Sequence, residues 1–160
     1  MLSDLIEDIN KFSDQIGVIG SLMGLDFGTK TIGVAISDRL QSVGTPRETI
    51  KRKKFGVDAD AIDRLIAENE VVGIVLGLPR NMDGSEGPRA QSTRAFARNL
   101  SARISIPIFF WDERLSTVAA ERVLIEADMS RKKRADVIDN VAASYILQGV
   151  LDRLGHVRAG

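Results

Sequence analysis

The stretch LMGLDFGTKTIGVAISD, residues 22–38, decides the fold of this chain. Two short apolar runs flank a tight turn that contains Gly28, and each run has the length of a strand. So short a connection predicts an antiparallel hairpin. One acid, Asp26, stands where the first strand is expected to end, and a carboxylate is costly to bury there unless it is paired, hydrogen-bonded or metal-bound. The stretch alone leaves Asp26 two roles, a turn residue bonded to its own backbone or a functional acid.

The composition is that of one globular domain. The chain has 160 residues, of which 44% are hydrophobic and 28% charged, which suffices for a core. It has no cysteine, so a disulfide scaffold and a thiolate metal site are excluded. Lys plus Arg and Asp plus Glu both number 22, which argues against a globally basic nucleic-acid binder but leaves a local basic surface open. No apolar run approaches the roughly 18 residues that span a bilayer, and the acidic start is unlike a secretory signal.

Further strands and helices alternate after the hairpin. In order, we expect a strand at 43–50, a helix at 57–69, a strand at 71–78, a Gly/Pro loop at 79–88, a helix to about 103, a strand at 105–111, a helix at 116–128 and a long last helix. Pro46 indicates that the strand at 43–50 is short or at an edge.

This order predicts an α/β fold with a five-stranded mixed sheet, β-β-β-α-β-α-β-α, and helices on both faces. Residues 1–20 are predicted to form an N-terminal arm, with a helix that Ser3 starts and Gly17 ends. The arm either packs on its own domain or contacts a partner. Residues 21–155 are expected to form a single domain, and 156–160 a tail.

Three groups of acids lie at the expected ends of elements. Asp26 ends the first strand, Asp112 and Glu113 follow the fifth, and Asp139 lies near the start of the last helix with Asp136 one turn earlier. Sites in α/β sheets gather beyond strand ends. Because neighbouring residues on a strand point to opposite faces, we expect only one of Asp112 and Glu113 to join Asp26.

Converging carboxylates repel one another unless a cation is present, and oxygen ligands suit Mg²⁺ or Mn²⁺. Two such ions about 4 Å apart can drive phosphodiester cleavage. Ala142 and Ala143, one turn after Asp139, would let the helix approach the sheet closely. The alternative is that each acid is an ordinary cap or salt-bridge partner.

Three ordered motifs resemble the signatures of the YqgF family, the Holliday junction resolvase-like proteins also described as pre-16S rRNA nucleases. They are LDFGTKTIGVA at 25–35, GLPRNMDGS at 77–85 and DERLST at 112–117, and the helix DVIDNVAA at 136–143 completes the pattern. The resemblance covers about residues 21–152.

The resemblance implies an RNase H-like fold and a cytoplasmic, metal-dependent nuclease that matures the 5′ end of 16S rRNA. It implies Asp26, Glu113 and Asp139 as catalytic acids and metal ligands, with Asp136 as a possible fourth ligand. Structured pre-ribosomal RNA is the implied partner, with ribosomal particles or branched DNA as further ones. One departure is that RuvC-type resolvases carry their second acid where this chain has Leu78 and Pro79, which argues against transferring junction resolution.

Basic and polar residues beside these motifs are predicted to contact the nucleic-acid backbone. They are Lys30, Arg80, Asn81, Arg89, Arg114, Lys132 and Lys133. Salt bridges to the acids and loop solubility remain alternatives for them.

Three other functions stay open. The residues around Asp26 also resemble the phosphate loop of sugar kinases and actin-like ATPases, although 160 residues leave no room for the second lobe that those proteins need. A scaffold that binds RNA or the ribosome without cutting, and a true DNA junction resolvase, are the other two.

Overall fold

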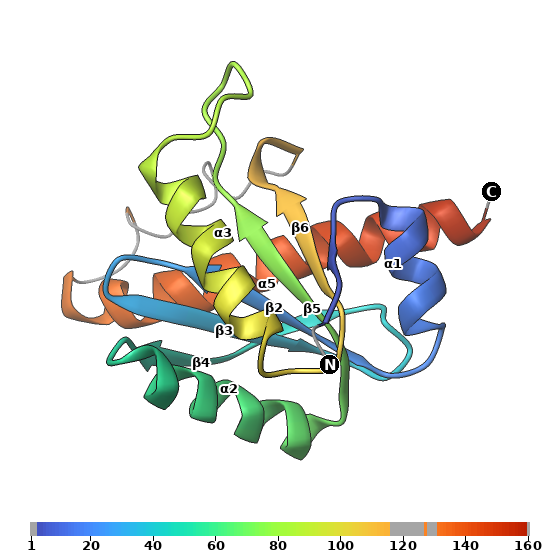
Figure 1. Ribbon diagram of the computed structural model, residues 1–160, viewed down its shortest axis with the longest axis horizontal. Coiled ribbons are helices and arrows are strands. Elements are labelled where there is room, and N and C mark those ends of the chain that lie inside the picture. Colours follow the sequence, from blue (N-terminus) through green and yellow to red (C-terminus); the bar gives the residue numbers. More distant parts are fainter. Residues whose placement is uncertain (1–2, 116–126, 128–130, 160) are drawn as a thin grey trace.

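The computed structural model describes residues 3–115, 127 and 131–159, with the backbone alone for 131–139. In chain order its elements are β1 (Leu5–Ile6), α1 (Ile9–Ile16), β2 (Ser21–Phe27), β3 (Thr31–Ser37), β4 (Gly44–Lys51), α2 (Phe55–Asn69), β5 (Val71–Leu78), α3 (Pro88–Ser101), β6 (Ile108–Asp112), the 3-10 turn η1 (Glu113–Leu115) and α5 (Arg131–Ala159) (Figure 1). The helix predicted at 116–128 lies, apart from residue 127, outside the described residues. No helix of the described part is long and apolar enough to cross a membrane.

The strands form one mixed sheet in the order β1-β6-β5-β2-β3-β4. β2, β3 and β4 are antiparallel neighbours, whereas β2, β5, β6 and β1 run parallel. The α/β class and the mixed sheet are confirmed. β4 is an edge strand, and Pro46 on it pairs with Ala35 beside a register shift. An edge tolerates proline because one side of the strand needs no backbone donor.

The prediction of five strands is wrong, because the N-terminal arm supplies a sixth. Leu5 and Ile6 pair with Ile108 and Phe109, and the Ile108 amide donates to the Asp4 carbonyl at 2.9 Å. Two residues are too few to produce a strand periodicity in the sequence. The arm's helix therefore begins at Ile9 rather than near Ser3.

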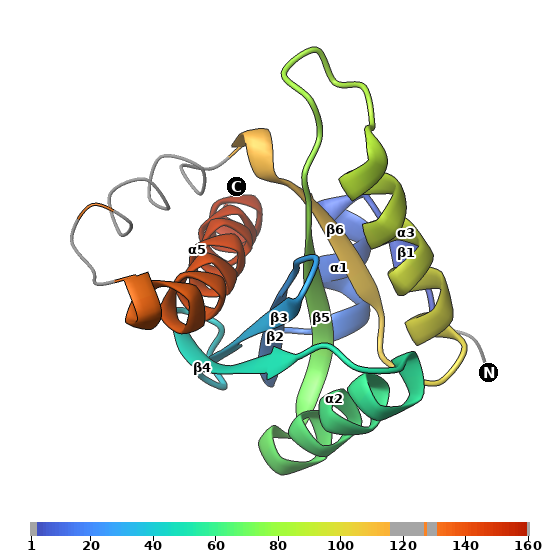
Figure 2. The ribbon, with the colours of Figure 1, turned by 90° about the vertical axis from the view of Figure 1, so that its left-hand side faces the viewer.

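Two separate apolar cores cover the two faces of the sheet. α2 and α3 pack on one face, around Leu25 and Leu76. α1 and α5 pack on the other, around Leu22, Val75 and Ile146. Figure 2 views the sheet with α5 on one side and α2 and α3 on the other. Helices on both faces are thereby confirmed, and the two faces are called the α5 face and the α3 face below.

α5 lies unusually close to the sheet. A Cβ atom on Gly24 would stand 2.8 Å from the Ala143 carbonyl oxygen, and one on Gly44 would stand 3.0 Å from Leu147 Cγ. Contact this close requires glycine on the strands and a small residue on the helix. The expected role of the alanines at 142 and 143 is confirmed, since both are buried against the sheet.

Candidate active site

Asp26 occupies the second-to-last position of β2, in the middle of the sheet, and only 3% of it is exposed. Its neighbours on the strand, Leu25 and Phe27, belong to the core of the α3 face. Because side chains alternate along a strand, the Asp26 carboxylate lies on the α5 face. A charged side chain this deeply buried needs polar or ionic partners. Its position at a strand end therefore indicates either a functional acid or a structural ion pair.

The β2–β3 hairpin that holds Asp26 closes tightly. The Gly28 amide donates to the Thr31 carbonyl at 2.8 Å, and a Cβ on Gly28 would stand 3.0 Å from that oxygen. The Arg52 guanidinium donates to the carbonyls of Gly28 and Thr29 at 2.8 and 3.1 Å. The turn is therefore fixed from both sides, which fixes the end of β2.

Glu113 extends over β5 toward Asp26. The register that pairs Leu25 with Leu76 places Asp26 beside Gly77 on β5. The carboxyl carbon of Glu113 lies 3.4 Å from the position of a Cβ on Gly77. Because Gly77 has no side chain, Glu113 and Ile146 of α5 can both approach β5 closely on the α5 face.

Asp112 lies on the opposite face of the sheet from Glu113. It pairs with Leu78, a residue of the α3-face core, and its carboxylate accepts from Arg114 Nη2 at 2.7 Å and from the Arg114 amide at 3.0 Å. The side-chain hydrogen bond from Arg114 lowers the pKa of Asp112 below its usual value. The structure thus separates the two neighbouring acids, with Glu113 on the Asp26 side.

The backbone of α5 carries Asp136 and Asp139. Arg158 near the far end of the helix donates to the Gly17 carbonyl at 2.6 Å, just before β2 begins, while Ala143 lies over Gly24. α5 therefore runs antiparallel to β2, and position 139, one turn before Ala143, lies toward the Asp26 end. The side chains of 136 and 139 are outside the described part of the chain.

Whether this site could hold a metal ion depends on which side-chain atoms are available as ligands. No group of three metal-binding side chains occurs among the described residues. Asp26 and Glu113 supply two carboxylates on one face of the sheet, and such oxygen donors suit a hard divalent cation. The described pair fits Mg²⁺ or Mn²⁺ as part of a larger ligand set.

Three of the predicted nucleic-acid contacts lie exposed around this end of the sheet. Lys30 is in the hairpin turn, Arg89 is in the first turn of α3, and Arg114 follows β6. Arg114 also donates to the Met82 carbonyl at 3.3 Å, so it links η1 to the 79–88 loop. Lys132 and Lys133 are on α5, where the structure describes the backbone alone.

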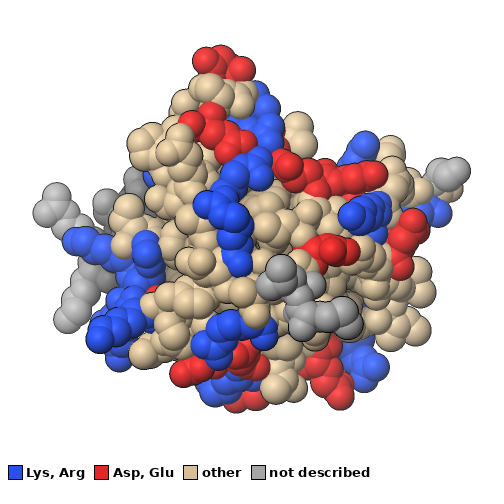
Figure 3. All heavy atoms as spheres, viewed as in Figure 1, with Lys and Arg blue, Asp and Glu red and all other residues tan. Residues whose placement is uncertain are grey.

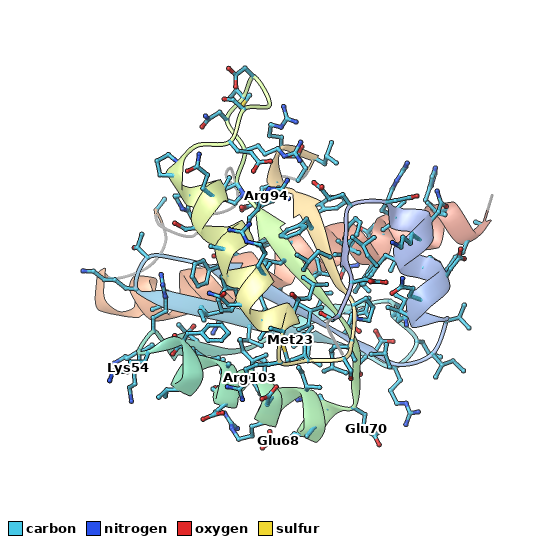
Figure 4. All side chains as sticks on the ribbon, viewed as in Figure 1. Met23, Lys54, Glu68, Glu70, Arg94 and Arg103 are labelled. Atoms are coloured by element: carbon cyan, nitrogen blue, oxygen red, sulfur yellow. The ribbon has the colours of Figure 1, made fainter. Side chains whose placement is uncertain are left out.

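Arg80 and Asn81 have structural partners. Arg80 lies 3.0 Å from Glu7 and 3.6 Å from Glu86, and both acids also pair with Arg94. Figure 4 labels Arg94 on α3, near the base of the 79–88 loop. Asn81 closes that loop on Ser85 through its amide at 2.9 Å and its side chain at 3.0 Å. The loop is therefore tied to the N-terminal arm, a link that sequence reasoning missed.

Sequence reasoning also missed two supports of the site, Gly77 and Arg52. A glycine inside an otherwise apolar strand indicates that another group approaches the strand closely. This signal could have identified Gly77. Arg52 stood in a run of basic residues and had no signal of its own.

The fold is similar to that of solved Holliday junction resolvases. The structure resembles T. thermophilus RuvC in complex with a Holliday junction substrate, with a TM-score of 0.55 and 9% identity over 85% of this chain and 96% of that one. It also resembles the yeast mitochondrial Holliday junction resolvase, with a TM-score of 0.51 and 13% identity over 94% and 87%. At such low identity these likenesses show the fold, and the expected RNase H-like class is confirmed.

The family model described as "RuvX: Holliday junction resolvase" matches residues 20–153. A protein of Ruegeria sp. (strain TM1040) is 64% identical over 159 residues, 99% of each chain, and one of Cereibacter sphaeroides (strain ATCC 17025 / ATH 2.4.3) is 67% identical over 92% of each. Both are named "Putative pre-16S rRNA nuclease". This chain belongs to the RuvX family, also called YqgF, which confirms the resemblance seen in the motifs.

Proposed function

We propose that this protein is a divalent-metal-dependent nuclease that cleaves phosphodiester bonds in pre-16S ribosomal RNA. The observation that supports it best is that buried Asp26 and Glu113 both lie next to Gly77, at the end of the sheet where α/β proteins form their sites. The names of the close relatives supply the substrate class. The place of action in this proposal is the cytoplasm.

The acids have distinct roles in this proposal. Asp26, in the middle of the sheet, would be the central metal ligand, and Glu113 from η1 and Asp139 from α5 would be the other ligands. Asp136 is a further ligand. When bound, a pair of Mg²⁺ or Mn²⁺ ions would supply activation of the attacking water and stabilisation of the leaving oxygen.

The chain's own residues then position the substrate. The tight β2–β3 hairpin keeps the Asp26 oxygens at a fixed place at the strand end, and burial beneath α5 limits how far they move. Lys30, Arg89 and Arg114, exposed around that end, draw the phosphate backbone toward the acids. Preorganised charge of this kind is usually the largest contribution to such catalysis.

A second candidate is cleavage of branched DNA. The family description names a Holliday junction resolvase, and the fold is shared with RuvC bound to such a junction. The same acids would act on either substrate, since phosphodiester hydrolysis needs the same charge arrangement in RNA and DNA.

The test compares a pre-16S rRNA fragment that spans the mature 5′ end with a four-way DNA junction, each with Mg²⁺ or Mn²⁺. We expect cleavage of the RNA by the wild type and its loss in Asp26→Asn, with an unchanged unfolding midpoint. Asp60→Asn is the matched control, because Asp60 is an exposed acid on α2 whose partner Arg103 also pairs with Asp63. Full activity in Asp26→Asn would overturn the assignment of the site, and cleavage of the junction alone would select the second candidate.

A further inference from the structure

A small basic cavity, here named the hairpin pocket, opens on the α3 face beside the end of β2. Its volume of about 170 Å³ lies below the roughly 300–1,000 Å³ of sites for drug-sized ligands. It suits one compact group. Its walls include Phe27, Thr29, Arg52, Pro88, Arg89 and Ser92.

The charge of the pocket is positive. Two of its walls are arginines and none of its lining residues is acidic. Within the described part of the chain, neither Arg52 nor Arg89 has a carboxylate at ion-pair distance. Figure 3 shows Lys and Arg side chains gathered at the end of the molecule where Figure 1 places the hairpin and the start of α2, and Figure 4 labels Lys54 there. A compact anion is the ligand that this charge favours.

Arg52 is held ready for such an anion. Its Nη1 donates to the carbonyls of Gly28 and Thr29, and its guanidinium carbon lies 4.2 Å from the centre of the Phe27 ring. Phe27 in turn stacks on Phe96 of the core, with ring centres 4.3 Å apart. These contacts fix the plane of the guanidinium, and its Nε and Nη2 donors have no hydrogen bond to any described residue. A fixed guanidinium edge matches two oxygens of a phosphate group.

The hairpin pocket and the proposed active site lie at the same end of β2, on opposite faces of the sheet. Asp26 and Phe27 are consecutive residues on β2, with Asp26 on the α5 face and Phe27 on the α3 face. A strand of nucleic acid that crosses the end of the sheet over the hairpin turn would therefore meet the acids on one side and the hairpin pocket on the other. We infer that the hairpin pocket binds a backbone phosphate of the substrate strand that flanks the phosphate being cleaved. This inference rests on the proposed function as a nuclease.

The first test measures binding of a fluorescein-labelled single-stranded pre-16S rRNA fragment in EDTA, where no cleavage occurs, over a range of salt concentrations. Removal of one phosphate contact should lower the salt slope, the fall of log K with log salt, by about 0.7. We expect this decrease, with weaker binding, in Arg89→Ala and Arg52→Gln. Arg98→Ala is the matched control, since Arg98 is exposed on the same helix but outside the pocket.

Arg89→Ala keeps the test valid if Arg52→Gln fails to fold, because the Arg89 side chain has no hydrogen bond or ion pair within the described residues. A slope in both pocket variants equal to that of Arg98→Ala would overturn the inference. The proposed function would survive that result, since metal-dependent cleavage by the wild type is measured separately. Absence of salt-dependent RNA binding by the wild type would overturn both.

The second test replaces single linkages of the same RNA by neutral methylphosphonates. At the linkage that occupies the pocket, the neutral group should weaken binding to the wild type and have no further effect on Arg89→Ala. Such non-additivity identifies a direct contact. We expect it at a linkage next to the cleavage position, and equal losses for both proteins at every linkage would contradict the inference.

Discussion

The carboxyl carbon of Glu113 lies 3.4 Å from the position that a Cβ atom on Gly77 would take. The same Cβ would stand 2.5 Å from Ile146 Cδ1 of α5. One missing side chain on β5 therefore makes room both for the helix above the sheet and for the acid beside Asp26. The site and the packing of α5 depend on the same position.

Gly77→Ala should destabilise the fold. The added methyl overlaps Ile146, and overpacking of this kind costs about 1–3 kcal/mol in the free energy of unfolding. Gly77→Ala/Ile146→Val, which removes the overlapping Cδ1 atom, should recover part of that loss in urea unfolding. Gly155→Ala is the control, since a Cβ there meets nothing within 4 Å. Equal stability of Gly77→Ala and the wild type would show that α5 adjusts without cost.

The decrease of the free energy of unfolding at low pH should depend on Asp38. Its carboxylate accepts hydrogen bonds from the amides of Val43 and Ser42 and from the Ser42 hydroxyl, each at 2.8 Å. These bonds, that from Val43 first, lower the pKa of Asp38 from 3.8 to about 2. Because the folded pKa is the lower one, the stabilisation is complete above the unfolded pKa of 3.8 and is lost as the pH falls toward 2.

Asp38→Asn therefore should be less stable than the wild type at pH 7, and the difference should shrink between about pH 4 and pH 2. Urea unfolding of both proteins at several pH values measures it. A difference that stays constant down to pH 2 would show that the carboxylate's charge contributes nothing at this turn.

The sequence predicted most of the sheet because its strands carry strong local signals. The apolar runs around Asp26 and at 71–78 became β2, β3 and β5, and Pro46 marked the edge strand. β1 escaped prediction since its two residues are held by pairing with β6, a contact between distant parts of the chain. The choice between Asp112 and Glu113 was open for a related reason. Alternation along the strand predicts opposite faces, but the register with β5 decides which acid lies beside Asp26.

The N-terminal arm should hold the 79–88 loop through Glu7. Glu7 Oε1 lies 3.0 Å from Nη2 of both Arg80 and Arg94. In Glu7→Gln we expect faster amide hydrogen exchange in the loop, and a fall of about 0.2–1 kcal/mol in stability, as for partly exposed ion pairs. The difference should decrease in high salt because the charges are partly screened.

Glu70→Gln is the control for this change, since Glu70 pairs with Arg39 in an exposed ion pair of 3.7 Å outside the loop. It should leave exchange of the loop amides unchanged. Equal exchange of these amides in Glu7→Gln and the wild type would mean that the turn between Asn81 and Ser85 holds the loop without the arm.

The two neighbouring acids after β6 should differ sharply in activity. Glu113→Gln should reduce the rate of metal-dependent RNA cleavage by about 10²-fold or more, the loss typical of one preorganised charged or polar group at a reacting centre. Asp112→Asn should reduce it far less, because Asp112 is bonded to Arg114 on the other side of the strand. Single-turnover cleavage at saturating metal measures both rates, and unfolding midpoints exclude loss of fold. If Asp112→Asn were the more damaging change, the ligand set would have to be built from the α3 face, contrary to the alternation that places Asp26 and Glu113 together.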